Sequence, residues 1–190
     1  MGEALLIRHG QTEWSRDGRH TGRSDVPLTE IGREQAQALR PGLAGRNPAC
    51  VLVSPLSRAR ETCALAGFGE RAETDPDLVE WDYGEYEGLT SPQIRGQQPE
   101  WSLWRDGCPG GESPADVGAR ADRVLARIAG IDGDGIVFSH GHFLRVLASR
   151  WIGLEAAAGA KLGLDVATLS ALGHEHDVDR VIRVWNAPLT

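Results

Sequence analysis

Three residues that follow the first apolar run have the side chains that phosphate chemistry needs. Residues 4–7 are apolar, and Arg8, His9 and Gly10 come directly after them. Arginine is a permanent, fork-shaped cation that matches phosphate oxygens, and glycine lets a ligand approach the backbone closely. The imidazole of His9 could serve as a nucleophile, a base or one more hydrogen-bond donor. Three residues recur by chance, so this interpretation depends on partners elsewhere in the chain.

Two further apolar runs end in residues of the same kind. Residues 50–53 lead into Ser54-Pro55 and then Arg58, and residues 136–139 lead into His140-Gly141-His142. In open α/β sheets, ligands bind beyond the carboxyl ends of the strands. If the three strands are parallel neighbours, their junctions share one edge with the N–H groups of helix N-termini, which bind anions. The sequence therefore predicts a pocket for a phosphoryl group.

Five segments, in order along the chain, resemble the histidine phosphatase (phosphoglycerate mutase-like) superfamily. The resemblance spans nearly the whole chain and implies a three-layer α/β/α sandwich with a mostly parallel central sheet. It also implies a phosphomonoesterase that needs neither a cofactor nor a metal. The segments are Arg8-His9-Gly10, Thr21-Gly22, Ser54 with Arg58, Glu80 with Tyr83-Gly84, and His140-Gly141.

The resemblance also implies a role for each matching residue. His9 would be the nucleophile that forms a phosphohistidine, and Glu80 would donate a proton to the leaving oxygen. Arg8, Arg58 and His140 would bind the phosphoryl oxygens. Ser15 replaces an Asn that is frequent in the family, which implies a shorter or water-bridged contact. The residues expected to complete the substrate and phosphate pocket are Gln11, Thr12, Ser15, Thr21, Gly22, Tyr83, Gly141 and His142.

The departures from the family pattern favour a phosphatase over a mutase. The mutases carry a Lys shortly after the Tyr83-like position, whereas residues 86–92 contain none. They also tend to have paired arginines after a Trp, whereas Arg105 and Asp106 follow Trp104. Fewer cations weaken the grip on a phosphoglycerate carboxylate and leave a phosphohistidine open to water. We expect the substrate to be a small phosphorylated metabolite. A cofactor-dependent phosphoglycerate mutase and a sugar bisphosphatase remain alternatives.

Strand and helix signals alternate along the chain, which predicts α/β layers. Ser or Thr before a helix is a good N-cap, and Pro is favoured at the first helical position. One helix is expected to start at Thr29 and to run to about residue 39, where Pro41-Gly42 should end or kink it. A second is expected to start at Ser54-Pro55 and to run to residue 66. Two more are expected from Ser113-Pro114 to 129 and from 143 to 151, and two late strands at 168–172 and 180–185.

Residues 67–111 form a less regular segment, rich in Gly, Pro, Trp and acids, that we expect to be a lid over the site. Its aromatic side chains either pack the lid or wall a substrate pocket. They are Trp81, Tyr83, Tyr86, Trp101 and Trp104.

For a few residues the sequence leaves the role open or favours a structural role over a functional one. His142 either contacts substrate or caps a helix, and His20 is expected at the surface. Glu112 belongs to a helix start but could reach the site, and the role of Arg105 is open. The run His174-x-His176-Asp177 is better explained by a polar hairpin turn than by a metal site.

Composition narrows the class of protein. The 190 residues fit one domain, 1–190. Twenty basic against 27 acidic residues give a net charge of −7, which argues against a nucleic-acid or anionic-membrane binder. No run approaches the roughly 18 apolar residues of a membrane span. Cys50, Cys63 and Cys108 lack metal-type spacing, so reduced thiols in a cytoplasmic protein are expected. The terminal strands could form a homodimer edge, although nothing requires it.

Overall fold

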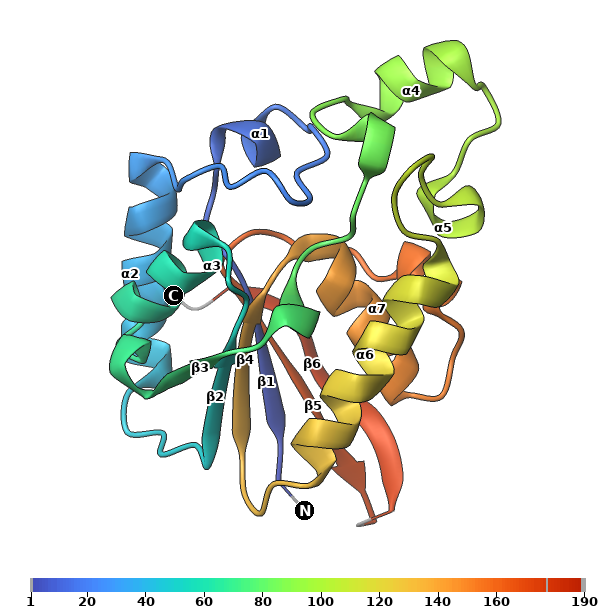
Figure 1. The fold of residues 1–190 in the computed structure, drawn as a ribbon. Helices are drawn as coiled ribbons and strands as arrows, with labels where there is room; N and C mark the ends of the chain where they lie inside the picture. The colour runs from blue at the N-terminus through green and yellow to red at the C-terminus, as the bar shows by residue number, and fades with distance from the viewer. Residues whose placement is uncertain (1, 177, 189–190) are drawn as a thin grey trace.

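A six-stranded mixed sheet forms the centre of the computed structural model, which describes residues 2–176 and 178–188 (Figure 1). The strand order is β3-β2-β4-β1-β5-β6. The first four strands of that order run parallel, β5 runs antiparallel to β1, and β6 runs antiparallel to β5. The strands are β1 (Ala4–Arg8), β2 (Cys50–Val53), β3 (Ala72–Thr74), β4 (Gly135–Ser139), β5 (Thr168–Glu175) and β6 (Asp179–Pro188).

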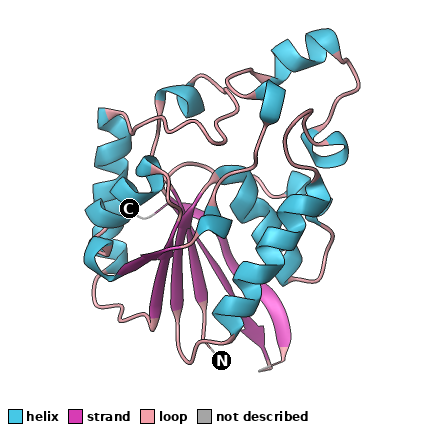
Figure 2. Ribbon diagram, in the orientation of Figure 1, coloured by secondary structure: helices cyan, strands magenta, loops and turns pink. Residues whose placement is uncertain are grey.

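Helices cover both faces of this sheet, so the predicted three-layer α/β/α sandwich is confirmed (Figure 2). Leu5 and Ile7 of β1 pack in one apolar cluster with residues of α2 and α3, while Ala4 and Leu6 pack in a second cluster with residues of α6 and α7. This alternation is the two-residue period of a strand buried on both faces. The α-helices are α1 (Glu13–Arg16), α2 (Glu30–Leu43), α3 (Ser57–Leu65), α4 (Ser91–Gln97), α5 (Leu103–Asp106), α6 (Pro114–Ala129) and α7 (Gly141–Trp151). Short 3-10 helices are Gly69–Arg71, Pro76–Leu78, Gly84–Tyr86 and Ala156–Lys161.

The three strands that carry the chemical motifs end at the same edge of the sheet. Arg8 of β1 is paired with Ser139 of β4, and Val53 of β2 is paired with Phe138 of β4. The segments after these strands therefore meet, as the sequence predicted. The short helices α1 and α4 lie beyond this edge in Figure 1.

Local capping explains where two helices begin. Ser113 accepts a hydrogen bond from the backbone N–H of Asp116 and completes a capping box, so α6 has the predicted bounds. Thr29 caps α2 by accepting from the N–H of Gly32, as predicted. The predicted end of this helix near residue 39 is wrong, because α2 continues through Pro41 to Leu43. Pro41 lies two residues before the end of α2, so its missing N–H and the bulk of its ring affect only the last part of the helix.

Two other predicted starts are wrong. Helix α3 begins at Ser57 and not at Ser54-Pro55, and Leu56 is an N-cap without a side-chain hydrogen bond. The hydroxyl of Ser54 is instead engaged by His140, at 2.7 Å. Helix α7 begins at Gly141 and not at Phe143, so His142 lies in its first turn.

The expected lid, residues 67–111, is more ordered than its composition suggested. It contains β3, α4, α5 and three of the 3-10 helices. Its aromatic residues mostly pack the interior: Trp81, Tyr83, Tyr86 and Trp101 are each at most 6% exposed. The packing alternative is therefore confirmed for most of them, and Tyr83 both packs the core and borders the pocket described below.

The C-terminal hairpin confirms the two predicted late strands. His174 lies on β5, His176 follows that strand with a positive φ of 49°, and Asp177 lies outside the described residues. Within residues 2–176 and 178–188 there is no group of three or more His, Cys, Asp or Glu side chains that could hold a metal ion. No helix in this part of the chain is long and apolar enough to cross a membrane.

Candidate active site

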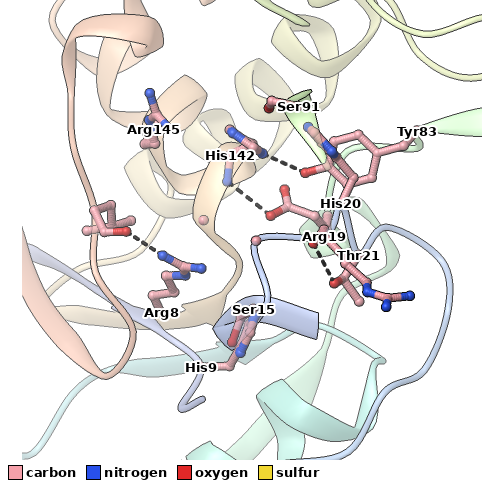
Figure 3. Close-up of a pocket in the computed structure, with 14 residues that line it drawn as sticks. Arg8, His9, Ser15, Arg19, His20, Thr21, Tyr83, Ser91, His142 and Arg145 are labelled. Carbon is pink, nitrogen blue, oxygen red and sulfur yellow. Dashed lines mark hydrogen bonds between the residues drawn. The ribbon is translucent and has the colours of Figure 1, made fainter. Parts of the chain in front are cut away.

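A cavity of about 190 Å³ opens at the sheet edge where the three motif-bearing segments meet (Figure 3). It combines cations, neutral imidazoles and a single carboxylate among its lining residues. These are Arg8, His9, Ser15, Gly18, Arg19, His20, Thr21, Glu80, Tyr83, Ser91, Gly141, His142, Arg145 and Leu164.

His9 is held as a neutral imidazole with one ring nitrogen free. Its Nδ1 lies 2.7 Å from the carbonyl oxygen of Gly10, which can only accept, so Nδ1 carries the proton and donates. The Nε2 atom therefore keeps its lone pair. Burial lowers the pKa of His9 well below 6.5, and the charges of Arg58 and Arg8 lower it further. A buried neutral imidazole with a free Nε2 is a competent nucleophile.

His140 lies next to His9, and its tautomer is also fixed by its partners. The two rings are 5.1 Å apart between centroids, edge to face. Arg58 Nε donates to His140 Nδ1 at 3.2 Å, so the ring proton is on Nε2, which donates to Ser54 Oγ at 2.7 Å. Burial, followed by the charge of Arg58, lowers the pKa of His140 well below 6.5. Both histidines are therefore neutral near pH 7.

Arg58 is fully buried and connects helix α3 to the loop of residues 21–24. Its Nη1 donates to the carbonyl of Ser24 at 2.8 Å, and its Nη2 donates to the carbonyls of Thr21 and Gly22 at 3.1 and 3.0 Å. With the bond to His140, these contacts use four of the five N–H donors of a guanidinium. Arg58 thus fixes both the loop and the His140 ring.

Glu80 is oriented by three backbone N–H groups. Its Oε1 accepts from Trp81 at 2.9 Å and from Phe143 at 2.8 Å, and its Oε2 accepts from His142 at 3.0 Å. Two of these donors belong to the first turn of α7. The Glu80 side chain is therefore fixed in the wall of the cavity that also contains His9.

Two close approaches of the backbone depend on glycine. A Cβ at Gly10 would lie 2.2 Å from the carbonyl oxygen of Gly32, so the loop after β1 can rest on the first turn of α2 only without a side chain there. A Cβ at Gly141 would lie 3.1 Å from Arg8 Cζ. Arg8 therefore passes directly over the start of α7. Its Nη1 donates to the carbonyl of Leu164, and its buried Nε has no partner among the described residues.

A second group of rings lines the wall away from His9. Tyr83 Oη and His142 Nδ1 are 2.6 Å apart, and the ring of His20 stacks on that of His142. Burial raises the pKa of Tyr83 well above 10 and lowers that of His142 well below 6.5. Because a phenol is a better donor than acceptor, Tyr83 donates to His142 Nδ1, and the His142 proton is on Nε2.

The predicted site residues differ in how they relate to the cavity. Arg58 and His140 lie behind His9 and do not border it. Gln11, Thr12 and Gly22 do not border it either. The Gln11 side chain accepts from Thr29, Thr12 caps α1, and the Gly22 N–H donates to Glu87. The predicted residues that border the cavity are Arg8, His9, Glu80, Ser15, Thr21, Tyr83, Gly141 and His142.

Ser15 borders the cavity, but its hydroxyl is engaged locally. The Ser15 Oγ accepts from the N–H of Thr12 at 2.9 Å and donates to the Thr12 carbonyl at 3.0 Å, within the capping box of α1. A direct contact between Ser15 and substrate would have to replace one of these hydrogen bonds.

Sequence reasoning missed several lining residues and misplaced one. His20, expected at the surface, is only 7% exposed and packs against Tyr83 and Trp101. No local pattern signals this position. Arg145 was missed although it is three residues after His142 on a helix, a spacing that places both on one face. The other lining residues that were missed are Gly18, Arg19, Ser91 and Leu164.

Two residues with open roles do not line this cavity. The Glu112 carboxylate accepts from Arg120 at 2.7 and 2.9 Å and from the N–H of Asp82 at 2.9 Å. It therefore fixes the segment next to Glu80 instead of reaching the cavity. Arg105 pairs with the neighbouring Asp106 at the surface.

Comparison with known proteins places the chain among phosphatases. The model of the histidine phosphatase superfamily (branch 1) matches residues 4–188. The acid phosphatase of Mycobacterium tuberculosis (strain ATCC 25618 / H37Rv) is 44% identical over 179 residues, 92% of this chain and 87% of that protein. Sedoheptulose 1,7-bisphosphatase of Saccharomyces cerevisiae (strain ATCC 204508 / S288c) is 39% identical over 184 residues, 79% of this chain and 67% of that protein.

A solved structure agrees closely with this fold. That structure, of an open reading frame product from Mycobacterium tuberculosis, aligns with a TM-score of 0.94 at 40% identity. The alignment covers 100% of this chain and 99% of the other.

Proposed function

This chain belongs to the histidine phosphatase superfamily (branch 1), and we propose that it hydrolyses phosphate monoesters of small metabolites through a phosphohistidine on His9. The observation that carries the proposal is the geometry of His9. Its Nδ1–H is engaged by the Gly10 carbonyl, its Nε2 is free, and its pKa is lowered well below 6.5 by burial. Phosphatase activity agrees with the names of the relatives, an acid phosphatase and a sugar bisphosphatase.

In the first step, His9 Nε2 attacks phosphorus, the N–P bond forms and the bond to the ester oxygen breaks. Glu80 donates its proton to the leaving oxygen, which becomes an alcohol. Phosphoryl transfer depends mainly on positioning and charge stabilisation. Arg8, which borders the cavity, supplies a cation. Arg58, which does not border the cavity, helps to lower the pKa of His9 and holds the His140 ring beside it.

In the second step, water attacks phosphorus, the N–P bond breaks and His9 is regenerated. The Glu80 carboxylate accepts a proton from that water, which restores its acid form. Splitting one displacement into two is the advantage of a covalent intermediate. The three reduced cysteines suit our proposal that this reaction takes place in the cytoplasm.

His9→Ala tests this mechanism directly. We expect the variant to lose phosphate release from every member of a panel of sugar phosphates, phosphoglycerates, nucleotides and phosphopeptides, measured with EDTA present. The native protein should also give a covalent phosphoenzyme that is stable in base and labile in acid. Activity that survives in His9→Ala would contradict the proposal. Isomerised phosphoglycerate without free phosphate would indicate a mutase instead.

A further inference from the structure

The backbone that carries Glu80 is held by side chains, because residues 79–83 lie in neither a helix nor a strand. Backbone carbonyls outside regular structure need other donors when they are buried. The guanidinium of Arg120, on α6, supplies them. Its Nη1 donates to the carbonyls of Asp77 and Val79 at 2.6 and 3.0 Å, and its Nη2 donates to that of Glu80 at 3.3 Å. Arg120 therefore fixes the path of the chain up to Glu80.

Glu112 holds the backbone on the other side of Glu80. Its Oε2 accepts from the N–H of Asp82 at 2.9 Å, and its own N–H donates to the Asp82 carbonyl at 2.9 Å. Its carbonyl accepts from the Trp81 indole at 2.9 Å. The two oxygens of its carboxylate accept from Arg120 Nε and Nη2 at 2.7 and 2.9 Å, a bidentate arrangement that fixes both side chains. The Arg120–Glu112 pair thus holds the chain before and after Glu80.

The pair also contacts the helix that orients the Glu80 carboxylate. Arg120 Cζ lies 4.8 Å from the centre of the Phe143 ring, and the Phe143 N–H donates to Glu80 Oε1. The hydrogen bonds of Arg120 use all five N–H donors of a guanidinium. The Arg120 and Glu112 side chains are 10% and 17% exposed, and neither residue is among those that border the cavity. Arg120 therefore has no donor left for a ligand, which indicates a positional role.

We propose that Arg120 and Glu112 are positioning residues that hold Glu80 where it can transfer its proton to the leaving oxygen. The inference rests on the proposed function, because it requires Glu80 to be the proton donor. A general acid must lie within hydrogen-bond reach of the atom that it protonates, and a misplacement of 1 Å can cost about 100-fold. A good leaving group needs little protonation. A disturbed pair should therefore slow esters with poor leaving groups selectively.

Arg120→Lys tests the proposal, because lysine keeps the charge opposite Glu112 but has three donors and no planar fork. The measurement is the ratio of kcat/KM on an alkyl phosphate to kcat/KM on p-nitrophenyl phosphate. We expect this ratio to fall by about tenfold or more. In a Glu80→Gln background the same substitution should change the ratio by less than about twofold, because the proton donor is already absent. A residue that merely stabilises the fold would slow both esters equally.

Arg123→Lys is the matched control. Arg123 lies on the same helix and pairs with Asp77 of the same segment, at 2.6 and 2.8 Å, but its side chain is 58% exposed. This substitution should leave the ratio unchanged. If Arg120→Lys does not fold, as judged by circular dichroism and urea midpoint, Glu112→Gln replaces it. Its amide oxygen can accept only one of the two parallel bonds from Arg120, so the ratio should fall by about threefold or more.

The outcomes separate this inference from the proposed function. A native ratio in Arg120→Lys, with both esters slowed equally or neither slowed, overturns the inference and leaves the proposed function intact. A fall of the same size in the Glu80→Gln background also overturns it, because the effect would not pass through Glu80. If Glu80→Gln alone leaves the ratio at the native value, the proton-donor role and this inference both fail. Activity that survives in His9→Ala contradicts the proposed function itself.

Discussion

At the scale of single residues, the proposed nucleophile and the proposed proton donor are held by different groups. His9 is made neutral by burial and by two neighbouring arginines, which lower its pKa. The Glu80 carboxylate is placed by backbone N–H groups of α7 and of Trp81, and no arginine of the described residues donates a hydrogen bond to it. We therefore expect substitution of Glu80 to alter proton transfer without removing the cations that are proposed to bind phosphate.

Glu80→Gln should slow esters with poor leaving groups far more than esters with good ones. The amide oxygen can still accept from the N–H groups of Trp81 and Phe143, and only the hydrogen bond from the His142 N–H is lost, so we expect the fold and phosphate binding to be largely preserved. An alkoxide needs the missing proton, and general acid catalysis of this kind is worth about 10²–10⁴-fold. The measurement is kcat/KM on an alkyl phosphate and on p-nitrophenyl phosphate. An unchanged rate on the alkyl ester would remove Glu80 from the role of proton donor.

At the scale of elements, the start of α7 is the most constrained part of the site. Its first turn supplies two N–H donors to Glu80, and its first residue, Gly141, lies under the guanidinium of Arg8. Helix propensity and the site therefore make opposite demands at this position. Alanine would favour the helix by up to about 1 kcal/mol, but its Cβ would crowd Arg8.

Gly141→Ala is therefore expected to lower activity while leaving stability nearly unchanged or slightly higher. A contact of 3.1 Å requires Arg8 to move by a few tenths of an ångström. A misplacement of 1 Å can cost about 100-fold, so a loss of several-fold in kcat is expected. Gly96→Ala is the control, because nothing lies within 4 Å of a Cβ at Gly96 on α4. Gly141→Ala with native activity would show that Arg8 is not fixed by this contact.

The sequence predictions succeed where the hydrogen bonds that decide the structure join residues close together in the chain. Helix α6 was predicted with its bounds because Ser113, Pro114 and Asp116 form its cap within four residues. Ser54-Pro55 carries a similar signal, but the Ser54 hydroxyl bonds to His140, 86 residues away in the chain. A local capping signal cannot reveal that a residue so far away in the sequence engages the Ser54 hydroxyl.

The same reasoning applies to the site. The motifs at His9, Arg58 and His140 could be found because each follows a strand, and parallel strands bring their ends together. His20 could not be found, because a contact with Leu89, 69 residues later, places its ring. The predicted roles of Gln11 and Thr12 stay untested, although their hydrogen bonds hold the loop around His9 and not the cavity wall.

At the scale of the whole molecule, charge is distributed unevenly. The chain carries a net charge of −7, yet its cavity is bordered by Arg8, Arg19 and Arg145 against Glu80 alone. A positive pocket on an acidic protein selects small anions over polyanionic surfaces, because the remaining surface repels the latter. A homodimer through the exposed edge strand β6 stays a prediction.

Burial of neutral histidines should also make the stability of the whole fold depend on pH. The pKa values of His9, His140 and His142 are all lowered well below 6.5, chiefly by burial, and that of His20 is lowered as well. Below pH 6.5 the unfolded chain binds protons that the folded chain does not, so stability is lost as pH falls. Each strongly shifted histidine contributes up to about 1.4 kcal/mol between pH 7.5 and 5.5, so the first three together contribute up to about 4 kcal/mol.

Urea unfolding at pH 7.5 and 5.5, in phosphate-free buffer, measures this loss. Phosphate must be absent because a ligand of the folded site would add its own stabilisation. Asp and Glu titrate mainly below this window, which isolates the histidines. In His140→Gln, the free energy of unfolding should change less between the two pH values, by up to about 1.4 kcal/mol, because one titrating group is removed. An equal change in the native protein and in this variant would mean that His140 is not held neutral by the fold.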